Sequence, residues 1–140
     1  MARRISFRRV SRAKDLVRIE KMHKEGFPRD SIPDFTGAVV WEMRVDKKIA
    51  GFTAVKRYEF DPTHAFLFRT YVREQYRGMG LQQRAIKHRL RYLKNNGAVR
   101  AYTYVIEGNY AILAALIKCG MRLYNSDWAG EGAYHLEKWL

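Results

Sequence analysis

The feature that most constrains the fold of this sequence is the change of hydrophobic period that follows residues 65–72. That run is rich in Phe and Tyr and is typical of a β-strand, whereas residues 78–96 carry apolar side chains at helical spacing. Gly78 and Gly80 lie at the junction between the two segments. A strand that leads through a glycine turn into a long helix belongs to a mixed architecture, so the sequence predicts an α/β fold.

The rest of the chain alternates short β-type runs with two further helical stretches. We expect strands at residues 4–10, 38–45, 49–58, 65–72, 99–105, 121–124 and 133–139. We expect helices at 12–24 with Ser11 as N-cap, at 78–96, and at 110–118 with Asn109 as N-cap. Turns are predicted at 46–48, at 61–63 and between the last two strands, around Asp127 and Gly130. In this order an antiparallel meander meets two strand–helix crossovers.

Length and composition indicate one folded domain, residues 1–140. The chain is 47% hydrophobic, 14% aromatic and 29% charged, which excludes a disordered tail and a low-complexity linker. Cys119 is the single cysteine, so no intramolecular disulfide and no metal site are expected, and its position predicts a small buried side chain rather than a nucleophile. No apolar run approaches the ~20 residues of a membrane span. Because Met1–Arg9 lacks the apolar region of a secretory signal, we expect a cytoplasmic protein without a membrane partner.

The net charge of +13 is concentrated in two segments. Residues 1–24 contain nine Lys or Arg and two Asp or Glu, a net +7, and residues 69–100 contain nine and one, a net +8. The remaining residues sum to −2. Such a field attracts phosphate-rich partners, among them nucleic acid, a phosphorylated cofactor or an anionic surface, although a charge run on a helix is usually a solvated face.

Residues 72–81 predict an anion site at the start of the long helix. Gly78 and Gly80 let backbone N–H groups turn inward with no Cβ in the way, and the first N–H groups of the helix point into the same space. The positive end of the helix dipole lies behind them, and Arg77 adds a charge in the turn. The segment lacks the Gly-Lys-Ser/Thr ending of a P-loop and the third glycine of a dinucleotide fingerprint, so neither of those sites is expected.

The motif Gln75-Tyr76-Arg77-Gly78-Met79-Gly80 resembles the Gln/Arg-x-x-Gly-x-Gly/Ala signature of the GNAT N-acetyltransferases. A second similarity is Asn109, which stands eleven residues before Gly120 on a predicted helix and 34 residues after Gln75. The order of the elements is similar to the GNAT fold over essentially the whole chain. The resemblance implies an α/β acyltransferase fold with a central, mostly antiparallel mixed sheet of six to seven strands, flanking helices and a splayed strand pair.

The resemblance also implies acetyl-CoA as co-substrate and direct transfer of its acetyl group to a primary amine, without an acyl-enzyme. In the family pattern a strand backbone pairs with the pantetheine arm, turn N–H groups hold the pyrophosphate, and the splay between residues 65–72 and 99–105 admits the thioester. A strand N–H near Val72 would polarise the thioester carbonyl. The residues that the resemblance assigns to cofactor binding are Tyr71, Val72, Arg73, Arg77, Gly78, Met79, Gly80, Leu81, Gln82, Asn109 and Leu116.

The catalytic positions depart from the family pattern. Leu116 stands where a tyrosine often protonates the leaving thiolate, and Phe66 and Phe68 occupy the strand positions where a glutamate often acts as base. Gln82 stands where a further glycine is common. The substitute candidates for an acid or base are His64, Glu59 and Tyr124. Approximation of the substrates and a thiolate leaving group allow catalysis even without such a pair.

Three hypotheses stay open at this point. The first is an acetyltransferase for the amine of a small molecule, peptide or protein. The second is the same fold acting on nucleic acid, either a modified base or a charged tRNA, and the third is a non-catalytic module that binds CoA or keeps only the fold. Residues 24–37 and 124–134 are the expected acceptor-binding region. The sequence indicates neither the acceptor nor whether the chain is a monomer or a homodimer, and CoA does not explain the charge of residues 1–24.

Overall fold

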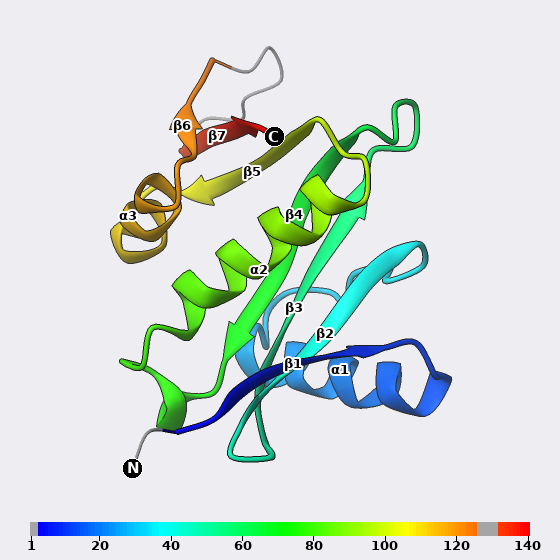
Figure 1. Cartoon of the computed structure of the whole chain (residues 1–140). Coiled ribbons are helices and arrows are strands. Elements are labelled where there is room, and N and C mark those ends of the chain that lie inside the picture. The colour runs from blue at the N-terminus through cyan, green and yellow to red at the C-terminus, as the bar shows by residue number, and fades with distance from the viewer. Residues whose placement is uncertain (1–2, 126–131) are drawn as a thin grey trace. The chain divides into compact units, whose positions relative to one another are not determined.

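The computed structural model of the chain describes residues 3–125 and 132–140. Its strands are β1 (Ile5–Val10), β2 (Ala38–Val45), β3 (Lys48–Arg57), β4 (His64–Val72), β5 (Arg100–Ile106), β6 (Arg122–Leu123) and β7 (Ala133–Trp139). They form one sheet in the order β1-β2-β3-β4-β5-β7-β6 (Figure 1). β4 and β5 run parallel, whereas the pairs β1–β2, β2–β3, β5–β7 and β6–β7 run antiparallel. The predicted mixed α/β class with a mostly antiparallel sheet is therefore confirmed.

The helices are α1 (Ala13–Gly26), α2 (Leu81–Asn95) and α3 (Tyr110–Lys118), with a short 3₁₀ helix η1 (Glu74–Tyr76) before α2. Strand ends agree with the sequence prediction to within one residue, but two helix starts differ. Arg12, not Ser11, is the N-cap of α1, and no side chain caps that helix. α2 starts three residues later than predicted, because Gly78 and Gly80 adopt left-handed φ values that keep the chain out of the helix. The predicted turn residues Asp127 and Gly130 lie outside the described residues.

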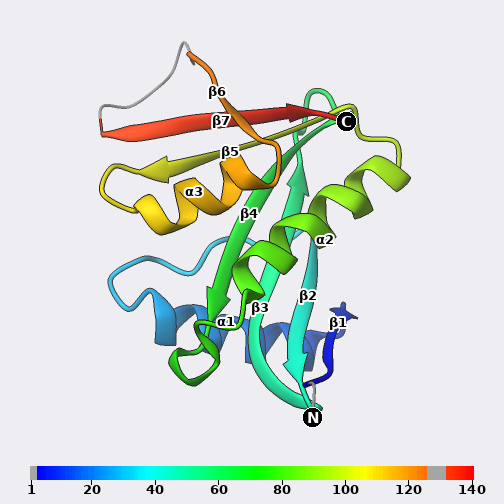
Figure 2. The ribbon, with the colours of Figure 1, turned by 60° about the vertical axis from the view of Figure 1, so that its left-hand side comes forward.

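The chain divides into two compact units, and the first consists of Met1–Lys56 and Phe68–Leu81. In this unit α1 packs against one face of the three strands β1, β2 and β3 (Figure 2). Ile19 and Met22 of the helix are buried in a cluster that includes Phe52 of β3. Phe35, from the segment between α1 and β2, closes this cluster with an edge contact to Phe52 at a centroid distance of 6.1 Å.

The second unit consists of Arg57–Leu67 and Gln82–Leu140. The apolar stripe predicted on α2 is buried, and it comprises Ala85, Ile86, Leu90 and Leu93. On β5 the buried residues Ala101, Thr103 and Val105 alternate with more exposed ones, as expected for a strand with one solvated face. In the described part of the chain, every helix is too short or too polar to cross a membrane.

β4 carries one residue more than β3, the antiparallel strand beside it. The Arg73 N–H donates to the Ala50 carbonyl and the Tyr58 N–H donates to the His64 carbonyl, both at 2.8 Å, which fixes the register at two points. Between these points β3 advances 58 − 50 = 8 residues, whereas β4 covers 73 − 64 = 9 residues. One residue of β4 therefore has no opposite residue, which defines a β-bulge.

Side-chain contacts place this bulge at Phe68 and Arg69. The hydroxyls of Thr53 and Thr70 hydrogen-bond at 2.6 Å, and Thr53 points away from the first unit's core because both of its neighbours on β3 belong to that core. In a regular strand Phe68 would share the face of Thr70. Phe68 instead packs against the core, with its ring centroid 5.6 Å from that of Phe35. The side-chain alternation of β4 thus shifts by one between Phe68 and Thr70.

β4 and β5 form a parallel ladder within the second unit. It pairs His64–Phe66 with Arg100–Tyr102. Thr103 Oγ1 of β5 also donates to the Leu67 carbonyl at 3.3 Å. A bulge bends its strand, so the extra residue bends β4 at Phe68 and Arg69.

Candidate functional site

The segment between β4 and α2 is a turn built around two glycines. Gly78 and Gly80 have φ values of +81° and +77°, which residues with a Cβ rarely adopt. A Cβ at either position would meet no heavy atom within 4 Å, so open space lies beside both. Among residues 3–125 and 132–140, the N–H groups of Gly78, Met79 and Gly80 donate no backbone hydrogen bond. No acidic residue occupies the first turn of α2, so no carboxylate there opposes the positive end of the helix dipole.

Arg77 stabilises the start of this turn. Its backbone N–H donates to the Glu74 carbonyl at 3.1 Å and closes η1. Its Nε donates to the Val72 carbonyl at 3.1 Å, which ties the guanidinium to the end of β4. The backbone donors that stay open to an anion therefore begin at Gly78, one residue later than the sequence analysis placed them.

The N–H groups of β4 next to the turn alternate between the edge toward β3 and the opposite edge. The Arg73 N–H points toward β3, because it donates to the Ala50 carbonyl. N–H groups alternate in direction along a strand, so those of Val72 and Thr70 point toward the other edge. The bulge interrupts this alternation before Thr70, and it thereby sets which residues of β4 present an N–H on that edge.

Glu25 of α1 holds two side chains from the end of β4. The Tyr71 hydroxyl donates to Glu25 Oε2 at 2.9 Å, and Arg73 Nε donates to the same oxygen at 3.2 Å. Burial raises the pKa of Tyr71, and the bond to Glu25 raises it further. The Tyr71 ring lies directly on Gly26, where a Cβ would collide with it. Sequence reasoning identified Tyr71 by its backbone alone, because nothing local to a strand indicates a partner 46 residues away.

Asn109 and Leu116 belong to the second unit. Asn109 is the N-cap residue of α3, as predicted, but its side chain makes no capping bond and is exposed. The amide is therefore available to a ligand. Leu116 is 3% exposed and contributes an apolar side chain, so α3 offers no proton donor at that position.

The three candidate acid or base groups lie in the second unit, where β4 and β5 are paired. His64 pairs with Arg100 at the first position of the ladder, and its Nε2 is 3.4 Å from Asp61 Oδ2. Glu59 is exposed in the connection between β3 and β4. The Tyr124 ring lies under the Arg100 guanidinium at 4.9 Å.

The segment between α1 and β2 places aromatic and charged side chains beside the bulge. The Arg69 guanidinium lies over the Phe27 ring at 5.3 Å, and its Nη1 is 3.4 Å from Asp30 Oδ2. The structure thus brings residues 24–37, part of the predicted acceptor region, against β4. Residues 126–131 of the other predicted segment, which include Trp128 and Glu131, lie outside the described residues.

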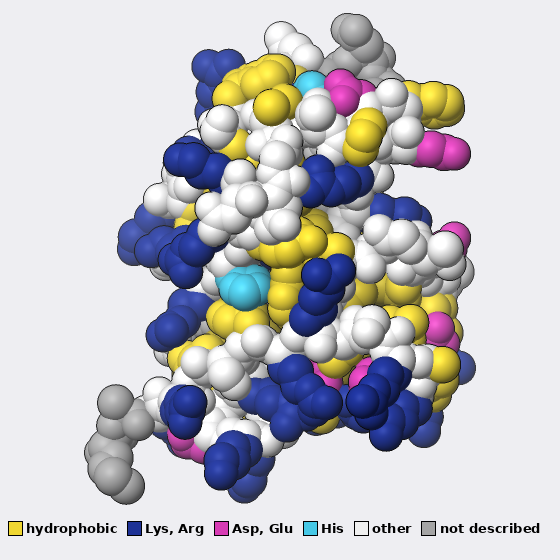
Figure 3. Space-filling model, turned by 45° about the vertical axis from the view of Figure 1, so that its right-hand side comes forward, with side chains coloured by type: hydrophobic (Ala, Val, Ile, Leu, Met, Phe, Trp, Pro, Cys, Tyr) yellow, Lys and Arg dark blue, Asp and Glu magenta, His cyan; other side chains and the backbone are white. Residues whose placement is uncertain are grey.

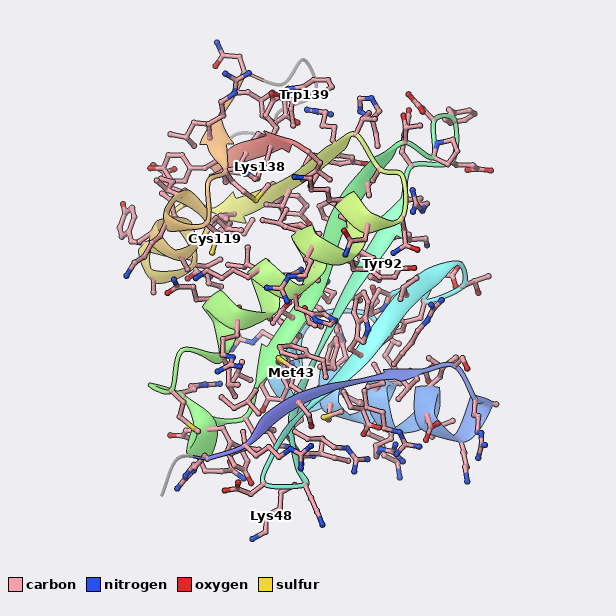
Figure 4. All side chains as sticks on the ribbon, in the orientation of Figure 1. Met43, Lys48, Tyr92, Cys119, Lys138 and Trp139 are labelled. Atoms are coloured by element: carbon pink, nitrogen blue, oxygen red, sulfur yellow. The ribbon has the colours of Figure 1, made fainter. Side chains whose placement is uncertain are left out.

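Cys119 is the C-cap residue of α3. Figure 4 labels both Cys119 and Lys138 of β7. Its Sγ is 3.9 Å from the Gln83 carbonyl, and burial raises the pKa of the thiol. A thiol with a raised pKa is a poor nucleophile at neutral pH, but the Cys119 side chain is only partly buried, so the expected full burial is not found. Within the described ranges, no three His, Cys, Asp or Glu side chains gather as metal ligands would.

Comparison with known families decides the assignment. Residues 11–121 match the acetyltransferase (GNAT) family. The chain belongs to the GNAT family. The matched GNAT region includes the glycine turn and Asn109, the two features on which the resemblance rests. A search of curated proteins finds no match to this GNAT chain.

Solved structures with the GNAT fold cover almost the whole chain. A Bacillus subtilis acetyltransferase in complex with CoA has a TM-score of 0.79 and 15% identity, over 98% of this chain and 99% of that one. Arabidopsis thaliana NAA60 in complex with acetyl-CoA has a TM-score of 0.77 and 19% identity, over 98% and 99%. An IAA acetyltransferase from Bacillus cereus has a TM-score of 0.77 and 13% identity, over 98% and 100%. Similarity at these identities establishes the GNAT fold.

Proposed function

We propose that this GNAT protein is an acetyl-CoA-dependent N-acetyltransferase that transfers the acetyl group directly to a primary amine. The glycine turn carries the proposal. Gly78 and Gly80 are left-handed, open space lies beside both, and their N–H groups donate no backbone bond in the described structure. A turn of this kind at a helix N-terminus accommodates phosphate. Membership of the GNAT family supports the phosphates of CoA as the ligand.

The residues of the turn fit a pyrophosphate. The N–H groups from Gly78 to Gln82 supply donors, and the first turn of α2 holds no carboxylate that would repel it. Arg84 and Lys87, both exposed on α2, add positive charge. In the second unit, the exposed amide of Asn109 is the group that the family pattern assigns to the pantetheine arm.

Bound acetyl-CoA supplies the activated acetyl thioester. The chain supplies the outer edge of β4, where the N–H groups of Thr70 and Val72 are placed to pair with an extended arm or to polarise a carbonyl oxygen. The bulge at Phe68 and Arg69 fixes the position of these donors.

The chain lacks a side-chain acid or base at the positions that the family pattern uses. Leu116 is buried and apolar, and Phe66 and Phe68 are engaged in aromatic contacts with Tyr104 and Phe35. We therefore infer that the acceptor amine attacks as its free base and that the thiolate leaves without a tyrosine donor. The rate of transfer then rises with pH up to the pKa of the acceptor amine itself.

Calorimetry with acetyl-CoA, followed by measurement of thiol release with a panel of primary amines, tests the proposal. We expect saturable binding and amine-dependent release of free thiol. Absence of acetyl-CoA binding would overturn the proposal. Binding without thiol release from any amine would assign the chain to the hypothesis of a non-catalytic module instead.

A further inference from the structure

The bulge in β4 turns a cation toward the segment between α1 and β2. Phe68 and Arg69 are consecutive, and in a regular strand they would leave opposite faces. Both nevertheless contact residues 27–37, since Phe68 packs against Phe35 and the Arg69 guanidinium lies over the Phe27 ring at 5.3 Å. Bulges re-aim side chains in this way, often next to active sites. The extra residue of β4 therefore holds Arg69 beside the predicted acceptor region.

The aromatic ring that carries the Arg69 guanidinium is itself fixed. The Phe27 ring packs against His23 of α1 at a centroid distance of 4.8 Å and meets Tyr71 of β4 edge-on at 6.2 Å. The Tyr71 hydroxyl is held in turn by Glu25. A cation–π contact uses the face of the ring as its partner and no oxygen atom. It therefore positions Arg69 while the N–H donors of the guanidinium stay available to an oxyanion.

Most of the hydrogen-bonding capacity of Arg69 is unused. Within residues 3–125 and 132–140, its one side-chain hydrogen bond runs from Nη1 to Asp30 Oδ2 at 3.4 Å. A well-formed bond from a guanidinium to a carboxylate measures about 2.7–2.9 Å and is frequently bidentate. Both side chains are accessible, with exposed fractions of 33% for Arg69 and 48% for Asp30. The guanidinium thus holds a carboxylate by a single long contact, which a better-placed carboxylate can replace.

Positive charge outweighs negative charge around this guanidinium. The charge of Arg69 lowers the pKa of the buried His23 by more than the charge of Asp30 raises it. Lys56 of β3 adds a second cation, with its Nζ 5.7 Å from the centre of the Phe68 ring. The chain as a whole carries +13, and Lys and Arg predominate over Asp and Glu on the face shown in Figure 3. Such a field attracts anionic substrates and repels cationic ones.

Arg69 adjoins the backbone donors that the proposed function uses. It precedes Thr70 in the chain, at about 3.8 Å between the Cα atoms, and the N–H groups of Thr70 and Val72 are those placed to polarise a carbonyl oxygen. The proposed phosphate turn begins at Gly78, beyond the end of β4 and η1, so Arg69 lies outside the group that would hold the phosphates of CoA. An anion bound to Arg69 and an amine that attacks the thioester can therefore belong to one small molecule.

The partner that Arg69 already has indicates which anion fits. Asp30 offers a carboxylate, and the planar fork of a guanidinium matches the two oxygens of a carboxylate in a bidentate pair. A phosphate group carries up to two charges and three acceptor oxygens, whereas a single guanidinium lies over Phe27. Resting on the proposed acetyltransferase function, we propose that Arg69 binds a carboxylate of the acceptor, so that this protein acetylates amines that also carry a carboxylate, as amino acids do.

Pairs of acceptors that differ in one charge test this proposal. The amino acids glycine, β-alanine and γ-aminobutyrate are compared with their carboxamides, in which the carboxylate is replaced by a neutral group. Thiol release at saturating acetyl-CoA gives kcat/KM for each acceptor with the natural protein and with Arg69→Gln, Arg69→Lys and Asp30→Asn. Lys21→Gln is the control, because it removes one positive charge from an exposed position on α1. Each acceptor is compared between proteins, so the different amine pKa values of acid and amide cancel.

We expect Arg69→Gln to lower kcat/KM for the preferred amino acid at least roughly tenfold and to leave its carboxamide unchanged, since bonds to a charged group contribute a factor of this order. Arg69→Lys should give an intermediate value, because lysine keeps the charge and loses the planar fork. Asp30→Asn should raise kcat/KM for the amino acid alone, because it frees the guanidinium. Lys21→Gln should keep the values of the natural protein.

Two outcomes would overturn this proposal and leave the proposed function intact. One is acetylation of the carboxamides that matches or exceeds that of the amino acids in the natural protein. The other is an equal fall for acid and amide in Asp30→Asn, which would place the ammonium group of the acceptor at Asp30. Absence of acetyl-CoA binding, or of thiol release with any amine, would overturn the proposed function and this proposal with it. Because Asp30→Asn changes an exposed side chain, it decides the question even if Arg69→Gln fails to fold.

Discussion

The Cβ position of Gly51 on β3 coincides with the carbonyl oxygen of Tyr71 on β4. A side chain at Gly51 would force one of the two strands to move, because the atom that it would meet belongs to the backbone. Gly51 therefore permits the close approach of β4 to β3.

We expect Gly51→Ala to lower the free energy of unfolding by about 1–3 kcal/mol and to weaken acetyl-CoA binding, because β4 must shift away from β3. Urea denaturation and calorimetry measure the two effects. Gly97→Ala is the control for acetyl-CoA binding alone, since Gly97 has a φ of +85° and open space around it, far from β4 in the sequence. A Gly51→Ala protein with unchanged stability would contradict the close approach.

Gly80 and Gly97 form a second matched pair, because both are left-handed glycines with no heavy atom near the position of a Cβ. Alanine at either site imposes a similar backbone strain, on the order of 1 kcal/mol. Only Gly80 belongs to the proposed phosphate turn, so Gly80→Ala should weaken acetyl-CoA binding at least roughly tenfold while Gly97→Ala leaves it unchanged. Equal dissociation constants for the two variants would show that the turn does not hold the phosphates.

His23 makes the first unit sensitive to acid. Its ring is fully buried, neither ring nitrogen has a hydrogen-bond partner, and it packs against Phe27 and Phe35. Burial, reinforced by the charge of Arg69 and opposed by Asp30, lowers the pKa of His23 from its ordinary value of 6.5. The folded protein thus holds the neutral ring, and the unfolded chain takes up a proton first as the pH falls. Stability is lost below about pH 6.5.

We expect His23→Leu to remove this part of the acid sensitivity. The variant should lose less stability than the natural protein between about pH 7.5 and about pH 5 in urea denaturation. His64→Gln, at a partly exposed histidine, serves as the control. If the free energy of unfolding fell equally with pH in the natural protein and in His23→Leu, His23 would not be a source of the acid sensitivity.

Glu137 on β7 is a second group whose ionisation makes the stability of the fold depend on pH. Here the charged form, not the neutral one, is favoured by folding. Burial opposes its ionisation, but Trp139, Arg100 and Arg122 outweigh that effect and lower its pKa below the ordinary value of 4.5. The contribution is therefore present above about pH 4.5 and is lost as the pH falls through the lowered pKa.

Glu137→Gln should lower the free energy of unfolding by about 1–3 kcal/mol at neutral pH, because the buried charge-assisted bonds to Arg100 are removed. The difference from the natural protein should shrink toward acid pH, as thermal unfolding at several pH values would reveal. Glu107→Gln, at an exposed carboxylate, is the control. A difference that stays constant into acid would contradict the lowered pKa.

Local sequence patterns predicted the helices and strands well, because the formation of a helix or strand depends largely on residues that are neighbours along the chain. The β-rich run of residues 38–45 and the apolar helical run of residues 110–118 form β2 and α3 with the predicted boundaries. The start of α1 differs by one residue, because Arg12 keeps an extended backbone and takes the N-cap position without a side-chain capping bond. The residues of the glycine turn were predicted from their conformational freedom, although the engagement of the Arg77 N–H within η1 was not.

The sequence by itself determined the order of strands and helices and the presence of a glycine turn before α2, because hydrophobic period and the backbone freedom of glycine are local properties. The tertiary structure decided the bulge at Phe68 and Arg69, the bond from Tyr71 to Glu25 and the burial of His23. The Phe-rich run of β4 reads as a regular strand, and only its register against β3 shows the extra residue. Register and burial arise from pairing between segments far apart in the chain, and a shift of one residue in that pairing changes which side chains and N–H groups face the site.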